Sequence, residues 1–338
     1  MIFQIIYFLT LISFLIYLYY LKIFFVGLRN KNGNISHNKP RVSVVIAARN
    51  ESENISRLLT SLVNQSYPIN LYEVIIADDD SSDNTTEIVK TFSKKWNNIK
   101  LIQVKGRKEA VSPKKNALSQ AIETSDGEVL LSTDADCIVG KYWIESMVAG
   151  FNENEMVIGF SRTKINNWKK SHLIQKFEHF DFLTMFIVAA GAISSGKYFS
   201  CSGQNIGYKK SDFQAVCGFE KIKHIVSGDD INLMQLFRKS KMKVEFAFST
   251  HSFVYTKAVD NLLQLLRQRS RWASNMKWQI ILNPEFFIYL LSVFFVTILP
   301  IILLFKCWWL GLGIIFIRVI LEFQFLKLGY MVFNEEKN

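Results

Sequence analysis

Residues 129–136 read Val-Leu-Leu-Ser-Thr-Asp-Ala-Asp, a short run of strand-forming residues that stops at two aspartates. Similar apolar runs precede it in the chain, and segments with apolar residues at helical spacing separate them. The strand-like runs are 42–47, 73–77, 101–104 and 129–133, and the helix-like segments are 53–64, 84–96 and 114–124. Repeated strand–helix units form parallel sheets covered by helices on both faces. The sequence therefore predicts an α/β fold of this kind over residues 40–165.

Acidic residues follow two of these runs directly. Asp78 and Asp79 follow the second run, and Asp134 and Asp136 follow the fourth. Ligands of open parallel sheets bind beyond the carboxyl ends of the strands, so we expect these carboxylates to face one crevice. Carboxylates at i and i+2, together with a diphosphate, suit a hard cation such as Mg²⁺ or Mn²⁺. Acidic residues after a strand also form turns and helix caps, and residues 81–83 fit that role alone.

Two further motifs lie downstream. Gly228-Asp229-Asp230 opens a helical pattern, where two carboxylates also favour a helix N-terminus. Residues 268–272, Gln-Arg-Ser-Arg-Trp, precede a long apolar segment. They are equally typical of a basic juxtamembrane helix with an interfacial Trp. Each motif by itself is compatible with catalysis and with a purely structural role.

Apolar residues make up 49% of the 338 residues and gather at the two ends of the chain. Residues 1–26, 286–305 and 308–328 are each long enough to span a bilayer, which takes about 20 apolar residues. The first segment lacks the basic start and cleavage site of a signal peptide, so we expect a retained anchor. Basic residues (Arg29, Lys31, Lys39 and Arg41) follow it at once. The positive-inside rule therefore predicts a cytoplasmic middle and a cytoplasmic tail over 334–338.

These features predict three parts: an N-terminal anchor over 1–26, a cytoplasmic domain over 40–275 and two transmembrane helices over 284–330. The net charge of +11 indicates an anionic membrane surface as the simplest partner, rather than nucleic acid. The four cysteines show no paired spacing and fit reduced thiols better than disulfides or a zinc site. They are Cys137, Cys201, Cys217 and Cys307.

Two segments allow more than one interpretation. Arg318 and Glu322 lie inside the third apolar segment at i, i+4, where they can pair on one helix face. An intramembrane charge pair indicates function, or else the third helix simply packs against the second. Residues 182–192 are nearly all apolar but too short to span a membrane. They predict either a buried core helix or a helix in the membrane interface near an acceptor site.

Taken in order, the motifs resemble the inverting glycosyltransferases of family 2, in the membrane-bound group that includes polysaccharide synthases and ceramide glucosyltransferases. The resemblance covers residues 40–275. The matches are Ser43–Glu51 for the first strand and turn, Asp78-Asp79-x-Ser81-Ser82-Asp83, Asp134-Ala135-Asp136, Asp229-Asp230 and Gln268-x-x-Arg271-Trp272. Asp80 stands where this family usually has Gly. The resemblance implies a GT-A fold, which is Rossmann-like with a mostly parallel sheet.

The resemblance also implies roles for the residues that hold the donor. Asp79 would bind the uracil, with Asp78 and the Asn50-Glu51 turn alongside. Asp134 would meet the ribose and the metal, and Asp136 would ligate the Mg²⁺ or Mn²⁺ that bridges the diphosphate.

Further matched residues would act on the reaction itself. Asp230 stands where the general base is expected, and Gln268, Arg271 and Trp272 would close over the diphosphate and acceptor. Lys114 begins a helix where the family often has a basic residue near the diphosphate, although a solvated charge is the alternative. Residues 202–205 resemble a loop near the acceptor, or form a plain turn.

These expectations predict a multi-pass enzyme of the cell membrane that transfers one sugar from a UDP-sugar to a lipid-linked or membrane-embedded acceptor. The alternative is a processive polysaccharide synthase, such as a poly-N-acetylglucosamine synthase, because the Gln-x-x-Arg-Trp motif often accompanies polymerisation. Three spans are few for a monomer that must build a secretion channel, which favours single transfer. A degenerate relative that binds without catalysis is a third possibility, and the intact acidic set argues against it.

Overall fold

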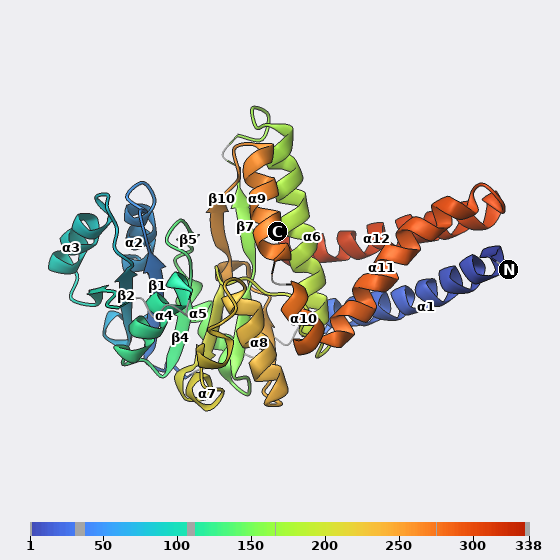
Figure 1. The fold of residues 1–338 in the computed structure, drawn as a ribbon. Coiled ribbons are helices and arrows are strands. Elements are labelled where there is room, and N and C mark those ends of the chain that lie inside the picture. Colours follow the sequence, from blue (N-terminus) through green and yellow to red (C-terminus); the bar gives the residue numbers. More distant parts are fainter. Residues whose placement is uncertain (1, 31–37, 107–111, 166, 275, 335–338) are drawn as a thin grey trace. The chain divides into compact units, whose positions relative to one another are not determined.

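The computed structural model describes residues 2–30, 38–106, 112–165, 167–274 and 276–334 (Figure 1). The chain forms two compact units. The first, which we call the sheet unit, contains Asn32–Phe186 and Ser200–Met276. The second, the helical unit, contains Met1–Lys31, Ile187–Phe199 and Lys277–Asn338.

A seven-stranded sheet in the order β3-β2-β1-β4-β8-β6-β9 forms the centre of the sheet unit (Figure 1). Its strands are β1 Val42–Ala48, β2 Tyr72–Asp78, β3 Ile99–Gln103, β4 Val129–Ser132, β6 Met156–Gly159, β8 Ile206–Lys209 and β9 Val244–Ala247. Strands β1 to β4 are parallel, β8 runs antiparallel to β4 and β6, and β6 is parallel to β9. The predicted, mostly parallel α/β sheet is confirmed, and the antiparallel β8 is an addition that the sequence pattern did not indicate.

Helices follow the strands as the apolar spacing predicts. The sheet unit contains α2 Ile55–Val63, α3 Thr85–Lys95, α4 Pro113–Glu123, α5 Trp143–Val148, α7 Lys210–Ala215, α8 Asp229–Lys239 and α9 Leu262–Ala273. The apolar residues of α2, at positions 55, 58, 59 and 62, are fully buried against alternate residues of β1 and β2. The predicted helices over 53–64, 84–96 and 114–124 are confirmed to within two residues at each end.

A second sheet of three short strands, in the order β5-β10-β7, completes this unit. Its strands are β5 Ile138–Val139, β7 Ser161–Lys164 and β10 Val254–Lys257. Helix α6, Leu173–Ile193, follows β7 and includes the predicted helix over 182–192. Phe182 and Phe186 are buried, as the core-helix interpretation predicts, whereas the first turns of α6 expose large apolar side chains.

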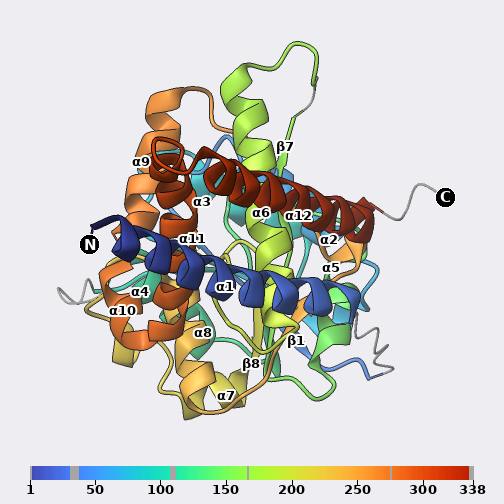
Figure 2. The ribbon, with the colours of Figure 1, turned by 90° about the vertical axis from the view of Figure 1, so that its right-hand side faces the viewer.

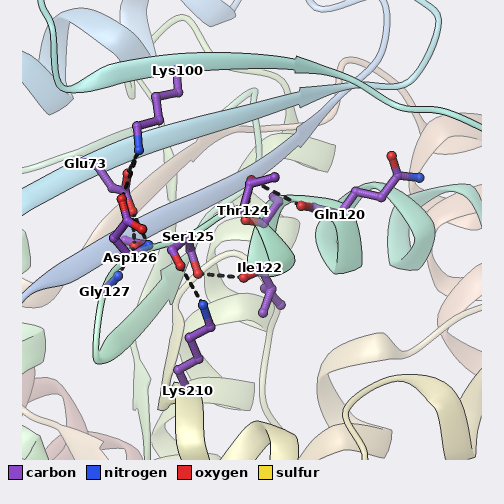
Figure 3. Close-up of polar contacts among 11 residues, drawn as sticks. Glu73, Lys100, Gln120, Ile122, Thr124, Ser125, Asp126, Gly127 and Lys210 are labelled. Atoms are coloured by element: carbon purple, nitrogen blue, oxygen red, sulfur yellow. Dashed lines mark hydrogen bonds and ion pairs between the residues drawn. The ribbon is translucent and has the colours of Figure 1, made fainter.

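A polar network secures the amino ends of the strands, at the edge opposite the Asp-x-Asp motif (Figure 3). The Glu73 carboxylate accepts hydrogen bonds from the Ser43 hydroxyl (2.6 Å) and the Asp126 N–H (2.7 Å), and it pairs with Lys100 (2.6 Å). Burial alone would raise the pKa of Glu73, but these donors hold it below its usual value. Lys210 donates to the Ser125 carbonyl (2.5 Å). The loop before β4 is therefore tied to β1, β2 and β8.

The helical unit contains α1 Ile2–Arg29, α11 Pro284–Leu303 and α12 Trp308–Asn334, with α10 Met276–Leu282 before α11. Three stretches, Phe3–Arg29, Pro284–Leu303 and Trp308–Phe333, are long and apolar enough to cross a membrane. The three predicted apolar helices are thus present. Helix α1 contacts α11, and α11 contacts α12 (Figure 2). Lys31 and the tail residues 335–338, both assigned to the cytoplasm above, lie outside the described residues.

Arg318 and Glu322 of α12 pair as their spacing predicts, at 2.7 Å. The Glu322 carboxylate also accepts a hydrogen bond from the Tyr17 hydroxyl of α1 (2.7 Å). Arg318 donates to the Thr297 hydroxyl of α11 (2.6 Å). The pair therefore joins all three long helices of this unit.

Candidate active site

The loops after β1 and β2 are joined by hydrogen bonds. The Asn50 N–H donates to the Ser81 hydroxyl (3.0 Å), and the Asn50 side-chain oxygen accepts from the Ser82 N–H (2.9 Å). Asp83 accepts from the Ser52 N–H (3.0 Å) and from Thr85, so it shapes the turn, as residues 81–83 alone suggest. These contacts hold the Asn50-Glu51 turn against the end of β2.

Asp80 occupies the position where the family usually has Gly. Its φ is +60°, in the left-handed region that Gly enters without steric cost. Asp enters this region more readily than most side chains because its short carboxylate bonds locally. Asp80 therefore adopts a backbone conformation that Gly also adopts easily, so Asp in place of Gly is compatible with this turn.

Asp78 and Asp79 end β2 as buried carboxylates. One Asp78 oxygen accepts from the Thr86 hydroxyl (2.9 Å), while its Oδ1 is buried without a hydrogen-bond partner among the described residues. Asp79 lies 3.5 Å from the Arg49 guanidinium. A buried acceptor without a donor costs free energy, so Asp78 Oδ1 is suited to receive an N–H from a ligand.

The Asp-x-Asp motif follows β4 and lies close to the turn after β1. Burial and then the negative charge of Asp134 raise the pKa of Asp136. Burial also raises the pKa of Glu51, with smaller contributions from Asp136 and Asp134. The structure therefore places the Asp-x-Asp carboxylates near Glu51 of the turn after β1, while the expected meeting with Asp78 and Asp79 stays a prediction.

Lys114 links this motif to the third acidic site. Its ammonium group lies 2.7 Å from Asp134 and 3.7 Å from Asp229. Lys114 is in the first turn of α4, where Pro113 takes the first position and the Ser112 hydroxyl caps the helix by accepting from the Lys115 N–H (3.3 Å). Although burial opposes its charge, the neighbouring carboxylates raise the pKa of Lys114. The amine is thus paired with carboxylates of both acidic motifs while its side chain remains partly exposed.

Asp230 lies in the first turn of α8, after Gly228, whose φ is +71°. Its two oxygens accept hydrogen bonds from the Gly203 N–H (2.6 Å) and the Ile231 N–H (2.7 Å). Burial and the neighbouring Asp229 charge raise its pKa to about 6. A carboxylate with a pKa near neutrality can both accept and release a proton under working conditions.

The loop over residues 202–205 contributes to this site. A Cβ on Gly203 would lie 3.5 Å from the Lys114 amine and 3.6 Å from the Asp229 and Asp230 side chains. Asn205, fully buried, fixes the loop by accepting from the Trp143 indole N–H (3.0 Å) and donating to the Phe160 and Ser252 carbonyls. The loop is therefore a turn held in position next to Asp230, and its expected role near the acceptor stays a prediction.

The Gln-x-x-Arg-Trp motif lies in α9, and two of its side chains face α6. Gln268 donates to Glu178 (3.4 Å), and the Trp272 ring lies 5.6 Å from the Phe182 ring. Arg271 is exposed, and its carbonyl accepts from the Ser227 hydroxyl (3.4 Å), next to the Gly228-Asp229-Asp230 turn. The motif therefore contacts the segment that carries Asp230 through this carbonyl.

Several residues of the site were not among those predicted. Lys115 is fully buried and donates to the Ile222 (3.1 Å) and Ile225 carbonyls, before the Asp229-Asp230 turn. Glu178 accepts from the Val259 N–H (2.7 Å) as well as from Gln268. The signals in the sequence are weak: Lys115 directly follows Lys114, and Glu178 lies at i, i+3 from Asp181, just before the apolar stretch 182–192.

Comparison with known proteins agrees with this geometry. The chain is 27% identical to beta-monoglucosyldiacylglycerol synthase of Trichormus variabilis over 75% of the chain and 52% of that protein. It is 24% identical to poly-beta-1,6-N-acetyl-D-glucosamine synthase of Staphylococcus epidermidis over 86% of the chain and 69% of that protein. The chain thus spans about half the length of the first of these relatives.

The fold matches that of a mannosyltransferase from Pyrobaculum calidifontis, solved with GDP-Man and Mn²⁺, with a TM-score of 0.63. The match covers 99% of both chains at 16% sequence identity, so it concerns the fold alone and confirms the expected GT-A architecture. The sequence model of glycosyl transferase family 2 matches residues 43–217. This match covers more than half of the chain, which therefore belongs to glycosyl transferase family 2.

Proposed function

We propose that this protein transfers one sugar from a UDP-sugar to a lipid-linked or other membrane-embedded acceptor, with inversion at the anomeric carbon. The observation that carries the proposal is the position of Lys114, which pairs with Asp134 on the donor side and with Asp229 beside Asp230. The Lys114 ammonium group thereby links Asp134, which is suited to binding the donor, to Asp229, which is next to the Asp230 carboxylate suited to proton transfer. This arrangement supports a single reaction centre over three separate structural features.

The donor would be held at the ends of β1, β2 and β4. Asp79 binds the uracil, with Asp78 and Glu51 alongside, and the unpaired Asp78 Oδ1 supports this assignment because it lacks a donor. Asp134 lies on the ribose side. The ammonium group of Lys114 provides a fixed positive charge for the diphosphate.

A divalent cation, Mg²⁺ or Mn²⁺, fits the Asp-x-Asp motif. Burial and then the negative charge of Asp134 raise the pKa of Asp136, and a bound cation would favour its ionised form. The described residues contain no group of three or more His, Cys, Asp or Glu side chains arranged for a metal, so Asp134 and Asp136 are the residues that would hold the ion. Bound by Asp134 and Asp136, the ion supplies neutralisation of the leaving diphosphate.

Asp230 acts as the general base. It takes the proton of the acceptor hydroxyl as that oxygen bonds to the anomeric carbon, and the bond to the diphosphate breaks with its electron pair on the leaving oxygen. A base on the face opposite the leaving group gives inversion, by the logic of inverting glycosidases. Arg271 adds positive charge towards the diphosphate, while Gln268 and Trp272 border the acceptor side.

Three observations support a membrane acceptor and a cytoplasmic site. The chain has three helices able to cross a membrane. A similar protein is named for its glucosyldiacylglycerol product. Arg29, Lys39 and Arg41 follow the first of these helices and favour a cytoplasmic sheet unit of a cell-membrane protein.

A processive polysaccharide synthase is the second candidate. The similarity to a poly-N-acetylglucosamine synthase over 86% of the chain favours it. The two candidates differ in the length of the product, because a single transfer leaves one sugar on the acceptor.

Product analysis tests the proposal. The purified full-length protein is incubated with membranes and radiolabelled UDP-Glc, UDP-GlcNAc, UDP-Gal or GDP-Man, with and without Mn²⁺ or Mg²⁺, and lipid extracts and gels are examined. We expect metal-dependent labelling of a lipid by one UDP-sugar. A ladder of long polymer would contradict single transfer, and labelling by GDP-Man alone would contradict the donor assignment. Asp230→Asn should slow the labelling about 10²–10⁴-fold, the usual contribution of a positioned base, and Asp212→Asn on α7 is its matched control.

A further inference from the structure

The first turn of α4 carries two consecutive lysines in different surroundings. Lys114 is partly exposed and pairs with carboxylates, whereas Lys115 is fully buried. A buried ammonium group loses its hydration, so it is retained only where the protein supplies hydrogen-bond acceptors. For Lys115 these acceptors are the backbone carbonyls of Ile222 (3.1 Å) and Ile225. The ammonium group of Lys115 thus holds backbone, whereas that of Lys114 holds side chains of the acidic motifs.

The backbone that Lys115 holds leads directly to Asp230. The short helix η3, Glu220–Ile222, ends at the first of the two carbonyls, and Ile225 precedes Asp230 by five residues. Residues 223–228, between η3 and α8, form turns and bends instead of a helix or strand. Buried carbonyls outside regular structure need a donor from elsewhere in the molecule. Lys115 therefore fixes one end of a short connection that carries Asp230 at its other end.

Two anchors thereby determine where the Asp230 carboxylate lies. The Gly203 N–H, in the loop before β8, donates to one carboxylate oxygen (2.6 Å), and Lys115 holds the chain that precedes the residue. The charge of Lys115 also acts at this site. Burial lowers the pKa of Lys115, and the nearby Asp229 and Asp230 carboxylates offset part of this effect. Helix α4, whose Lys114 pairs with the carboxylates, is therefore also tied to the backbone behind Asp230.

We infer that Lys115 is a positioning residue for the transfer reaction, which holds the Asp230 carboxylate in place through the backbone before α8. This inference deepens the proposed function and rests on it, because it takes Asp230 as the general base. An apolar side chain at position 115 would leave both carbonyls without the lysine donor, so the connection could shift. A displacement of a reacting group by about 1 Å can cost about 10²-fold in rate.

A double-mutant cycle on the full-length protein tests this role. Lys115→Met keeps an unbranched side chain and removes the ammonium group. It should lower kcat about 10²-fold, while the affinity for UDP in the presence of Mn²⁺ stays nearly unchanged. In an Asp230→Asn background the same substitution should change kcat little, because residues that act as a unit have non-additive effects. An equal fold-change in both backgrounds would overturn the inference, since a general structural loss lowers activity whichever residue stands at position 230.

The matched control is Lys210→Met. Lys210 also donates to a backbone carbonyl, that of Ser125, but at the amino edge of the sheet (Figure 3). This control should leave kcat unchanged, and a loss equal to that of Lys115→Met would overturn the inference in favour of general destabilisation. If Lys115→Met does not fold, Lys115→Arg takes its place in the cycle. Arg keeps the charge but moves the donor atoms, so we expect a smaller loss of kcat with the same dependence on Asp230.

Hydrogen exchange measured by mass spectrometry separates this inference from the proposed function, because it needs no transfer activity. In Lys115→Met protein we expect faster amide exchange over residues 222–230, with unchanged exchange there in Lys210→Met. Unchanged exchange in Lys115→Met would overturn the inference even if the enzyme is active. Faster exchange together with a fully active Asp230→Asn variant would instead overturn the assignment of the base, while the contact of Lys115 with this segment stands.

Discussion

Asp230 has the two properties that a general base requires at the scale of a single residue. Its position is fixed by the Gly203 and Ile231 N–H groups, and its pKa is raised to about 6 by burial and by Asp229. The ionised form is therefore available at neutral pH and still binds a proton effectively. Asp83, three residues after Asp80, has a different role. Its carboxylate oxygens accept hydrogen bonds from Ser52 and Thr85, so that it shapes a turn.

The first prediction concerns the pH dependence of transfer. If Asp230 is the base, kcat/KM should fall as the pH drops through about 6, because protonation removes the acceptor of the hydroxyl proton. Asp230→Asn should lower kcat about 10²–10⁴-fold, the usual contribution of a positioned base, with UDP affinity nearly unchanged. Steady-state kinetics and UDP titration measure both quantities. A variant with full activity would show that another group takes the proton.

The same substitution should change how stability depends on pH. The pKa of Asp230 is higher in the folded protein than its ordinary value, so its stabilising effect is complete below that ordinary value and is lost as the pH rises through about 6. Asp230→Asn removes the ionised carboxylate, but its single amide oxygen can accept from only one of the Gly203 and Ile231 N–H groups. The Tm of the unmodified protein should therefore fall between pH 4 and pH 8 relative to that of the variant, as thermal unfolding in detergent measures. A Tm difference between the two proteins that is the same at both pH values would contradict this electrostatic cause.

Asp136→Ala should impair metal binding rather than proton transfer. Without this carboxylate, the Asp-x-Asp motif loses a ligand for a hard cation, so UDP binding should lose its dependence on Mn²⁺ or Mg²⁺. Calorimetric titration of UDP with and without the ion measures the difference. Asp230→Asn provides the comparison, because it should keep the metal dependence that Asp136→Ala removes.

At the scale of elements, the loops at the two edges of the sheet behave differently. At the carboxyl edge, carboxylates cluster, and burial together with the neighbouring charge of Asp134 raises the pKa of Asp136. At the amino edge, Glu73 is surrounded by donors that lower its pKa, a pattern of structural stabilisation (Figure 3). The functional edge of the sheet is therefore marked by carboxylates that lie close to one another, and not by the presence of acidic residues alone.

Glu73→Ala should therefore destabilise the sheet unit without changing the chemistry. The substitution leaves the Asp126 N–H without its acceptor and Lys100 without its shorter ion pair, at a cost of about 2–3 kcal/mol. Because the pKa of Glu73 is lowered on folding, this contribution is present above its ordinary pKa and is lost as the pH falls through the folded value. Unfolding at pH 7 and pH 3 measures the change. The control is Glu87→Ala, which breaks an exposed pair with Lys90 and should leave the Tm unchanged.

At the scale of the whole molecule, the sheet unit carries the candidate chemistry and the helical unit carries the helices able to cross a membrane. Within the helical unit, Glu322 accepts a hydrogen bond from Tyr17 and Arg318 donates one to Thr297, so one polar cluster joins residues up to 305 positions apart in sequence. A satisfied pair in this position serves helix packing, which is the simpler of the two interpretations of its spacing.

Removing one residue of the Arg318–Glu322 pair should lower the stability of the helical unit more than removing both residues. Glu322→Leu leaves the Arg318 guanidinium without its carboxylate, which should cost about 1 kcal/mol or more and lower the Tm in detergent. The double variant Arg318→Leu/Glu322→Leu removes both charges and should recover most of that loss. If the double variant is as unstable as the two single losses combined, the pair itself contributes nothing.

The local pattern of residues in the sequence determined the main strands and helices of this protein. The apolar runs over 42–47, 73–77 and 129–133 became β1, β2 and β4, because strand and helix periodicity acts over fewer than about a dozen residues. The carboxylates that follow them had to share one edge, because parallel strands end on the same side. The three apolar helices followed from length and composition alone.

The tertiary structure decided the rest, because the remaining contacts join segments distant in sequence. Lys114 meets Asp229 across 115 residues, and Gly203 binds Asp230 only once β8 has inserted antiparallel between β4 and β6. The outward direction of Phe177 likewise depends on Glu178 finding its partners on α9 and the loop before it. Such pairings depend on the packing of the whole unit, which the local sequence pattern does not specify.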